Sequence, residues 1–169
     1  MSLGRLRSAF ISAALVAVSA TPVLAQSSFA PPPLVPYGLS IDVDNAKTAA
    51  AAAVAEAKKN NWRMAVAVVD TGGYLVYFEK MADTQTGSVD LAIEKARTSA
   101  LFRRPSKLFQ DAVAGGGEGI RLLRLTGAIP IDGGVPIIVD GKLIGAVGIS
   151  GGSGDQDGTV AKAGASALK

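Results

Sequence analysis

The stretch from Gly127 to Gly158 holds most of the residues that could do chemistry in this chain of 169 residues. Inside it, Gly148–Gly152 matches the G-x-S-x-G pattern, in which a serine nucleophile sits on a sharp turn between a strand and a helix. Such a serine needs a neighbouring base, usually an imidazole, and the chain contains no histidine. We therefore predict no catalytic residue here. The chain also lacks cysteine, so the usual zinc sites are excluded as well.

The glycine-rich loop Ser150–Gly154 favours a binding site over a reaction centre. Glycines leave backbone amides within reach of a ligand, and a loop that opens a helix turns those amides toward an anion. Asp155 and Asp157 follow directly, however, and would repel a phosphate, and no nucleotide-binding glycine pattern is present. We expect the loop to border a small-molecule site. Tight packing of a strand against a helix is the alternative role for most of its residues.

The predicted site is a cleft between this loop, the turn Gly133–Pro136 and a helix that bears Lys95 and Arg97. A cation from that helix could neutralise an acidic ligand, such as a propionate or a small carboxylate. The alternative is that Lys95 pairs with Asp155 or Asp157 and only holds the loop. The residues predicted to bind ligand are Lys95, Arg97, Gly133, Gly134, Val135, Pro136, Ser150, Gly151, Gly152, Asp155, Gln156 and Asp157.

The elements around this site begin with two apolar runs, Val135–Val139 and Leu143–Ile149, which flank an Asp-Gly-Lys turn. An Asp-Gly between strand-forming residues predicts a β-hairpin. An Ala-rich segment that ends at Leu168 then predicts a closing helix, with Ser153 or Asp155 as its N-cap.

The first half of the domain predicts a helix followed by another hairpin. Helix-forming residues fill Asp44–Lys59, with Ser40 or Asp42 as N-cap and a stripe of alanines at helical spacing. The runs Trp62–Val69 and Tyr74–Phe78 flank an Asp-Thr-Gly-Gly turn and predict the hairpin. The first of these strands is apolar on both faces, so we expect it to be central in its sheet.

The sequence pattern in the middle of the chain predicts two more helices, followed by a glycine-rich loop. Ser88–Arg104 has the apolar spacing of an amphipathic helix, and a proline ends it. A shorter helix is expected over Pro105–Val113. Gly115–Gly117 interrupts the chain before Leu122–Leu125, an apolar run whose secondary structure the pattern leaves open.

The N-terminus has the features of a Sec signal peptide. Arg5 and Arg7 form a positive region, an apolar run follows over Ala9–Ala20, and small residues precede a cleavage site after Ala25. We therefore expect a periplasmic or secreted protein with no stable membrane anchor. The predicted organisation is a signal peptide over 1–25, a Pro-rich tether over 26–39 and one domain over 40–169.

Charge and composition narrow the range of partners. Seventeen basic residues stand against fourteen acidic ones, and two of the basic residues lie in the leader, so the mature chain is nearly neutral. We expect no nucleic-acid binding, because phosphate backbones require a concentrated basic patch. The prolines of the predicted tether favour an extended segment. The alternative is an arm that packs on a neighbouring subunit through Phe29, Leu34 and Tyr37.

Three segments, Ala65–Met81, Ile93–Phe102 and Ile129–Gly164, together resemble the GlcG/HbpS-like family, which includes the C-terminal domain of PduO proteins. They carry the motifs V-D-x-x-G-x-L, K-A-x-x-S-A, G-G-V-P-I and D-G-x-x-I-G-A-x-G-x-S-G-G followed by Q-D. The resemblance implies an α/β (α+β) fold, a profilin-like three-layer α-β-α sandwich on a five-stranded antiparallel sheet. It also implies assembly into a homo-oligomer of four or more subunits.

The same resemblance implies haem or a related tetrapyrrole as the ligand, sometimes described as haem degradation. If haem is bound, we expect Met81 or Tyr77 to contact the iron, because histidine is absent. The favoured function is therefore an exported small-molecule-binding protein. The second hypothesis is an enzyme that acts on a small organic acid without histidine or cysteine, and the third is a structural oligomer of the cell envelope.

Overall fold

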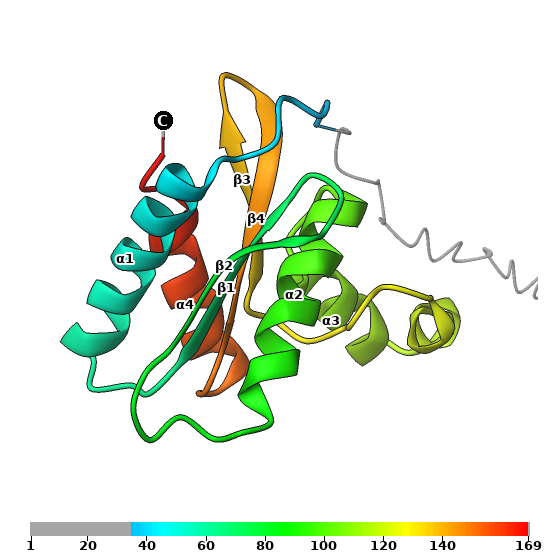
Figure 1. Ribbon diagram of the computed structural model, residues 1–169. Coiled ribbons are helices and arrows are strands. Elements are labelled where there is room, and N and C mark those ends of the chain that lie inside the picture. The colour runs from blue at the N-terminus through cyan, green and yellow to red at the C-terminus, as the bar shows by residue number, and fades with distance from the viewer. Residues whose placement is uncertain (1–34, 169) are drawn as a thin grey trace, which may run out of the picture. The chain divides into compact units, whose positions relative to one another are not determined.

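Figure 1 shows the computed structural model of the chain, which describes residues 35–168. The chain divides into two units, and the first, Met1–Ala30, lies outside the described residues. The predicted signal peptide and residues 26–34 of the predicted tether lie outside them too. The described elements are α1 (Val43–Lys59), β1 (Ala65–Asp70), β2 (Leu75–Lys80), α2 (Ser88–Phe102), α3 (Lys107–Ala114), the 3-10 helix η1 (Gly117–Arg124), β3 (Gly134–Val139), β4 (Lys142–Ser150) and α4 (Gly154–Ala165).

The sheet consists of the two predicted hairpins, joined side by side in the order β2-β1-β4-β3 with all neighbours antiparallel. The prediction of five strands is wrong for residues 35–168, which form four. Among the described residues in front of α1, 35–42, a single isolated bridge joins the sheet, between Tyr37 and Leu143. Pro36 has no N–H to donate, so its carbonyl accepts from Leu143 but no ladder extends from it.

Helices cover both faces of the sheet, which gives the predicted order of layers, with α1 and α4 on one face and α2 on the other (Figure 1). β1 is central and its first five residues are buried, as predicted. Val66 and Val68 pack in the core beneath α1 and α4, while Ala65 and Ala67 pack toward α2. Alternate strand residues point to opposite faces, so a strand apolar at every position fits only between two layers of helices.

The approach of α2 to the sheet is unusually close. A Cβ atom placed on Gly148 would collide with the carbonyl of Ala92, and one on Gly134 with the carbonyl of Lys95. The alanines of α2 face the same surface, since Ala92, Ala96 and Ala100 are fully buried. Small side chains on both surfaces therefore let α2 pack close against β3 and β4.

Local capping sets the helix ends that matter for the site. Asp42, rather than Ser40, caps α1 by accepting from Asn45 N at 2.8 Å. Ser153, rather than Asp155, caps α4, and Gln156 completes a capping box by accepting from Ser153 N at 3.0 Å. The predicted glycine loop is thus the turn between β4 and a firmly capped α4.

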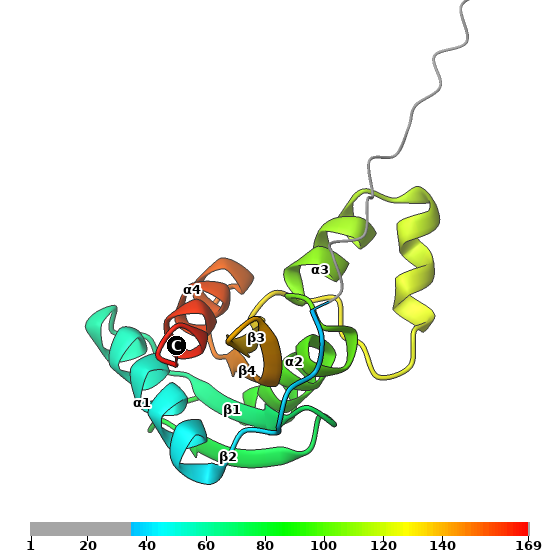
Figure 2. The same cartoon turned by 90° about the horizontal axis from the view of Figure 1, so that it is seen from above.

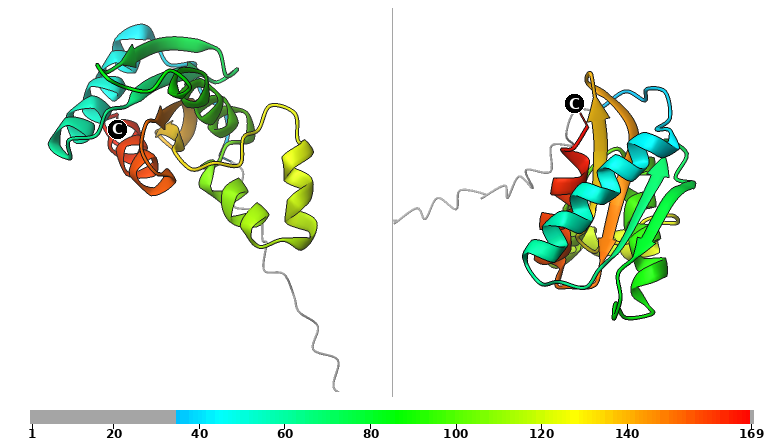
Figure 3. Two further views of the ribbon diagram at one scale, coloured as in Figure 1. Left: turned by 90° about the horizontal axis from the view of Figure 1, so that it is seen from below. Right: turned by 60° about the vertical axis from the view of Figure 1, so that its left-hand side comes forward.

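The helix α3 and the 3-10 helix η1 form an arm beside the sandwich. η1 contains the Leu122–Leu125 run almost entirely, and none of its residues is buried. Figures 2 and 3 show η1, in yellow, next to α3 and away from α1 and α4. In the part of the chain that the structure describes, no helix is long and apolar enough to cross a bilayer.

Candidate functional site

Lys95 of α2 does not face a cleft. Its side chain is 1% exposed, and its Nζ lies 2.6 Å from Oδ2 of Asp157, whose side chain is 3% exposed. α2 and α4 lie on opposite faces of the sheet, so this ion pair connects the two outer layers around one end of it. Two roles were predicted for Lys95, neutralising an acidic ligand or pairing with an aspartate of the loop. The structure shows the second, with Asp157 as the partner.

Both oxygens of the Asp157 carboxylate accept hydrogen bonds from neighbouring groups. Its Oδ1 accepts a hydrogen bond from the backbone N of Gly152 at 2.9 Å, and Oδ2 accepts from Lys95. Burial is the largest influence on this carboxyl and raises its pKa above the ordinary value of 3.8, although the hydrogen bond and charge of Lys95 act in the opposite direction. The group therefore joins a helix, a loop and a buried cation.

Gly133 closes the space in which the ligand cleft was predicted. With its φ of +120°, a Cβ there would lie 2.7 Å from the carbonyl oxygen of Ile149, 2.8 Å from Asp157 Cβ and 2.9 Å from Lys95 Nζ. Only a glycine fits these contacts and this backbone angle. Lys95, Gly133, Gly152 and Asp157 thus come together, as predicted, but as a packed junction.

A second buried carboxylate, Asp132, lies next to this junction. The sequence analysis did not predict it as a site residue. It is 3% exposed, accepts from the backbone N of Gly133 at 2.6 Å, and its own N–H donates to Gln110 Oε1 at 2.8 Å. A Cβ on Gly158 would lie 2.6 Å from its Oδ2. Its position directly before two glycines was the available signal, because an aspartate there can accept from the next backbone N–H.

The remaining predicted site residues divide between packing and surface. Gly134 N donates to Ser106 Oγ at 2.9 Å, and Ser150 Oγ lies 3.1 Å from Ser88 Oγ in a buried contact. Val135 and Pro136 belong to β3, and Gly151 and Gln156 belong to the loop and the capping box. Asp155 and Arg97 are exposed.

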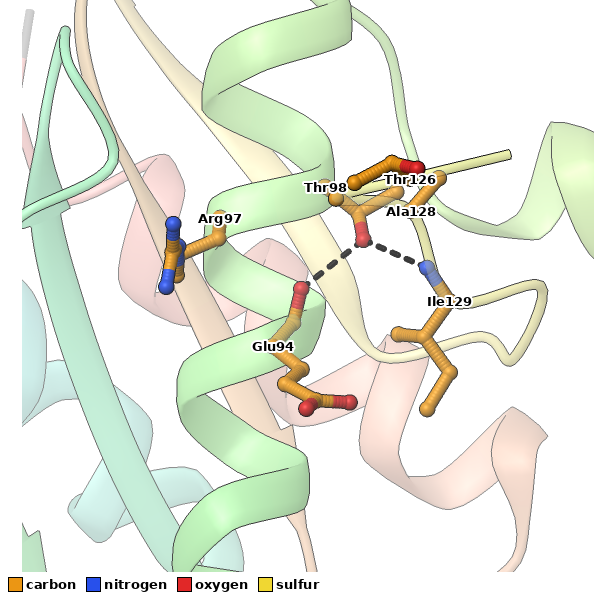
Figure 4. A pocket seen from close by; sticks show the side chains of 7 residues that line it. Glu94, Arg97, Thr98, Thr126, Ala128 and Ile129 are labelled. Atoms are coloured by element: carbon orange, nitrogen blue, oxygen red, sulfur yellow. Dashed lines mark hydrogen bonds between the residues drawn. The ribbon is translucent and has the colours of Figure 1, made fainter. Parts of the chain in front are cut away.

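Arg97 instead borders a pocket between α2 and the segment that leads into β3 (Figure 4). The pocket has a volume of about 310 Å³ and is lined by Glu94, Arg97, Thr98, Thr126, Gly127, Ala128 and Ile129. Thr98 is fully buried, and its Oγ1 donates to the carbonyl of Glu94 and accepts from Ile129 N, each at 2.8 Å. Thr98 therefore fastens the wall of the pocket to the helix.

Arg97 and the apolar residues that line this pocket lie on different sides of α2 (Figure 4). Glu94 and Arg97 are exposed, one turn apart on α2, and neither forms an ion pair with any residue in 35–168. Ala128 and Ile129 supply apolar surface on the Thr98 side of α2, whereas the Arg97 side chain extends from the other side of the helix (Figure 4). There it lies next to the turn of the first hairpin, with its Cγ 3.5 Å from a Cβ placed on Gly73. The pocket therefore offers apolar surface, and Arg97 offers a cation at its edge that could hold a carboxylate.

The two residues predicted to contact a haem iron lie elsewhere. Met81 is 8% exposed and belongs to the core cluster beneath α1 and α4. Tyr77 is half-buried, and its hydroxyl lies 3.4 Å from Glu79 Oε2. Neither lines the pocket, and the described residues contain no group of three or more acidic, histidine or cysteine side chains that could hold a metal ion.

Comparison with known proteins places these observations in a family context. A family model described as haem degrading protein HbpS-like matches residues 41–166. Protein GlcG of Escherichia coli strain K12 is 43% identical over 100 residues, which cover 59% of this chain and 73% of GlcG.

Two solved structures have the same fold over most of the chain. The crystal structure of HbpS has a TM-score of 0.71 at 28% identity and covers 78% of this chain and 92% of its own. The crystal structure of a PduOC:heme complex has a TM-score of 0.69 at 28% identity, with 78% of this chain and 96% of that chain covered.

Proposed function

The chain belongs to the HbpS-like family, and from this membership we propose that it binds haem or a related tetrapyrrole. One of its solved relatives is a complex with haem. The observation on this chain that supports the proposal is the pocket on α2, where Ala128 and Ile129 offer apolar surface and Arg97, at the edge of the pocket, forms no ion pair with any residue in 35–168. A tetrapyrrole with propionates is a flat apolar ring that carries carboxylates, so it matches both features.

Arg97 would hold a propionate, and Ala128 and Ile129 would contact the ring. Charge-assisted hydrogen bonds of this kind are among the stronger ones available to a surface site. The volume of about 310 Å³ is at the lower end of the range for small-molecule pockets, roughly 300–1,000 Å³. One chain would therefore enclose only part of the ring.

The residues of the pocket fit the ring and its carboxylates but not the iron. Haem iron is usually held by histidine, cysteine, methionine or tyrosine, and none of these lines the pocket. Binding is proposed here without any chemical step at the metal.

The test is to titrate hemin into the mature chain and into Arg97→Ala and to measure the dissociation constants by calorimetry. We expect the variant to bind about tenfold more weakly, because it loses a charge-assisted contact of about 1.5–3 kcal/mol, which solvent at this exposed position weakens. Arg63→Ala is the matched control, because Arg63 is also exposed and does not line the pocket. Equal hemin affinity in all three proteins would remove this pocket from consideration.

Assembly into a homo-oligomer of four or more subunits is part of the proposal. The supporting observation is the arm, where Ile120 and Leu123 of η1 are 53% and 58% exposed and the adjoining Leu125 is 37% exposed. Clustered apolar side chains of this kind mark interaction surfaces. Light scattering should give a mass of at least four chains, and Ile120→Asp with Leu123→Asp should lower it. A monomeric wild type at micromolar concentration would end this part of the proposal.

Export to the periplasm or medium is proposed from the leader sequence over 1–25. Expression of the full chain should yield a product that begins at Gln26, which intact-mass measurement of the exported fraction checks. A product that retains the leader, in the cell interior, would contradict it.

A further inference from the structure

Two exposed rows of charge, of opposite sign, lie on α2 and on η1. On α2, Asp90 and Glu94 are exposed one turn apart, and neither forms an ion pair with any residue in 35–168. On η1, Arg121 and Arg124 are exposed one turn apart, and Arg124 likewise forms no ion pair in that range. Like charges one turn apart repel each other, so each row is stabilised by a neighbouring row of the opposite sign.

The spacing of the two rows is the same, although the two helices differ in kind. From Asp90 to Glu94 the α-helix rises about 6 Å along its axis. From Arg121 to Arg124 the 3-10 helix also rises about 6 Å, and side chains three residues apart lie in line along it. The two carboxylates of α2 can therefore meet the two guanidiniums of η1 at the same time.

A third charge in each row sets the direction of such a contact. α2 continues with Arg97, and η1 begins with Glu118. In an antiparallel alignment Asp90 lies opposite Arg124. Arg97 then lies opposite Glu118, so every position pairs charges of opposite sign. A parallel alignment would instead place both Asp90 and Arg97 opposite residues of their own sign, which disfavours it.

Apolar side chains lie next to the charged row on both surfaces. Ile120 and Leu123 are more than half exposed and form the adjoining row of η1. On α2, the Glu94 carboxylate lies on the side of the helix that faces Ile129, where the pocket wall is apolar (Figure 4). Within residues 35–168 no ion pair joins the two rows, and η1 packs on α3 of its own chain. Both surfaces are therefore open to another molecule.

We infer that η1 of one copy of this chain lies antiparallel along α2 of a second copy. Arg124 then pairs with the partner's Asp90. In the same way Arg121 pairs with the partner's Glu94. This inference rests on the proposed assembly and names the surface that η1 meets in it. A contact between two different surfaces is made twice across a two-fold axis or repeated around a ring, and both arrangements occur in closed homo-oligomers.

The experiment reverses one charge on each surface. Asp90→Arg and Arg124→Glu suit it, because both side chains are exposed, form no ion pair in 35–168 and do not line the pocket. Each variant should therefore keep the circular dichroism spectrum of the wild type. Light scattering at micromolar concentration should give each variant alone a mass no more than about half that of the wild type, because like charges then meet at every such contact.

An equimolar mixture of the two variants should recover the wild-type mass. The reversed α2 of one variant meets the reversed η1 of the other, and the two unchanged surfaces also meet, so every contact again joins opposite charges. Recovery also requires that both variants are folded. Lys58→Glu, on the exposed surface of α1, is the matched control, since it has the same change of charge as Arg124→Glu and should leave the mass unchanged.

Every other outcome counts against the inference. Single variants that keep the wild-type mass would overturn it and leave the proposed assembly intact. A mixture that stays dissociated would also overturn it, because the two charges would then not act on each other. A loss of mass in Lys58→Glu equal to that in Arg124→Glu would assign the effect to net charge, with the same result. If the wild type is itself monomeric, the proposed assembly fails, and the inference fails with it.

Discussion

Lys95 and Arg97 are cations two residues apart on one helix, and the fold places them in opposite environments. Lys95 is buried against Asp157 at the junction of α2, α4 and the glycine loop, whereas Arg97 is exposed at the rim of a pocket. Consecutive helical residues are about 100° apart, so positions i and i+2 point to opposite sides of the helix. One region therefore has its charges satisfied internally, and the other keeps a charge available.

Within the one helix α2, Lys95 therefore serves the packing of the fold, and Arg97 is available to a ligand. At the junction, each polar group has a partner and a methyl group added to Gly133 would meet neighbours at 2.7–2.9 Å. At the pocket, Thr98 alone is fully satisfied and buried, while Glu94 and Arg97 are open to solvent. Substitutions in the first region should act mainly on stability, and those in the second mainly on ligand affinity.

The largest expected effect is that of Lys95→Ala. Removal of the cation leaves the Asp157 carboxylate buried without its charged partner, which typically costs about 3–5 kcal/mol of unfolding free energy. Arg97→Ala, on the same helix and with the same change of charge, should alter stability by no more than about 0.5 kcal/mol. Urea unfolding monitored by circular dichroism measures both.

The double substitution Lys95→Met with Asp157→Leu sharpens this test. Replacement of both members of a buried ion pair by apolar residues is often nearly neutral, so most of the lost stability should return. A Lys95→Ala protein as stable as Arg97→Ala would erase the contrast between the two regions.

Gly133→Ala should have the next largest effect. The added methyl meets the carbonyl of Ile149 and the ion pair, which should cost about 1–3 kcal/mol for crowding in addition to the strain of a positive φ. Gly141→Ala is the control for a positive φ without crowding, because Gly141 has φ of +72° and no atom within 4 Å of an added Cβ. Thermal unfolding of the two variants should therefore differ, and equal losses would show that the junction tolerates an extra methyl.

Thr98→Val changes the wall of the pocket and should have a smaller effect on stability. The variant keeps the shape but leaves Ile129 N without its acceptor, which should cost about 1–2 kcal/mol and loosen one wall of the pocket. Thr98→Ser should retain both hydrogen bonds and most of the stability. Hydrogen exchange at the Ile129 amide measures this effect. The exchange should be faster in Thr98→Val and unchanged in Thr98→Ser.

The smallest expected effect is a dependence of stability on pH through Asp157. Burial raises the pKa of this carboxyl above 3.8, so the folded chain holds the proton more tightly than the unfolded chain does. The contribution of such a group is therefore greatest below the unfolded pKa and is lost as pH rises through the folded pKa. Unfolding free energies of the wild type should fall relative to those of Asp157→Asn over that interval.

The exposed Asp155→Asn, on the same turn of α4, is the matched control for this comparison. A wild type that gains stability relative to Asp157→Asn as pH rises would show that the Lys95 charge outweighs burial, and it would reverse the stated direction of the pKa shift.

Most elements of the fold were predictable because each has a local cause. The Asp-Gly turn, the Ser153 cap and the doubly apolar β1 each carry a physical signal within a few residues. The fifth strand was expected only from family resemblance, and the observed Tyr37 bridge depends on long-range pairing. The secondary structure of the Leu122–Leu125 run was not predictable, since even the eight residues of η1 are too few to separate a 3-10 repeat from an α-helical one.

The site was less predictable because it depends on which way a side chain faces. The sequence indicated that α2 brings a cation to the glycine loop, and helical spacing alone could have shown that Lys95 and Arg97 cannot both do so. The pocket wall at 126–129 has no motif, and it forms only because Thr98 accepts from Ile129 N across 31 positions of the chain. Contacts of that kind follow from the completed fold.

The central position of β1 has a consequence for the order in which the chain is made. Ala65 pairs with Ser150, so one edge of β1 lacks its partner until β4 has been synthesised. At roughly 5–20 residues per second, this leaves a strand that is apolar from Ala65 to Val69 with an open edge for several seconds. An open edge of this composition is a template for pairing with other nascent chains. The free edge of the first hairpin is therefore closed only after the C-terminal half of the chain has been made.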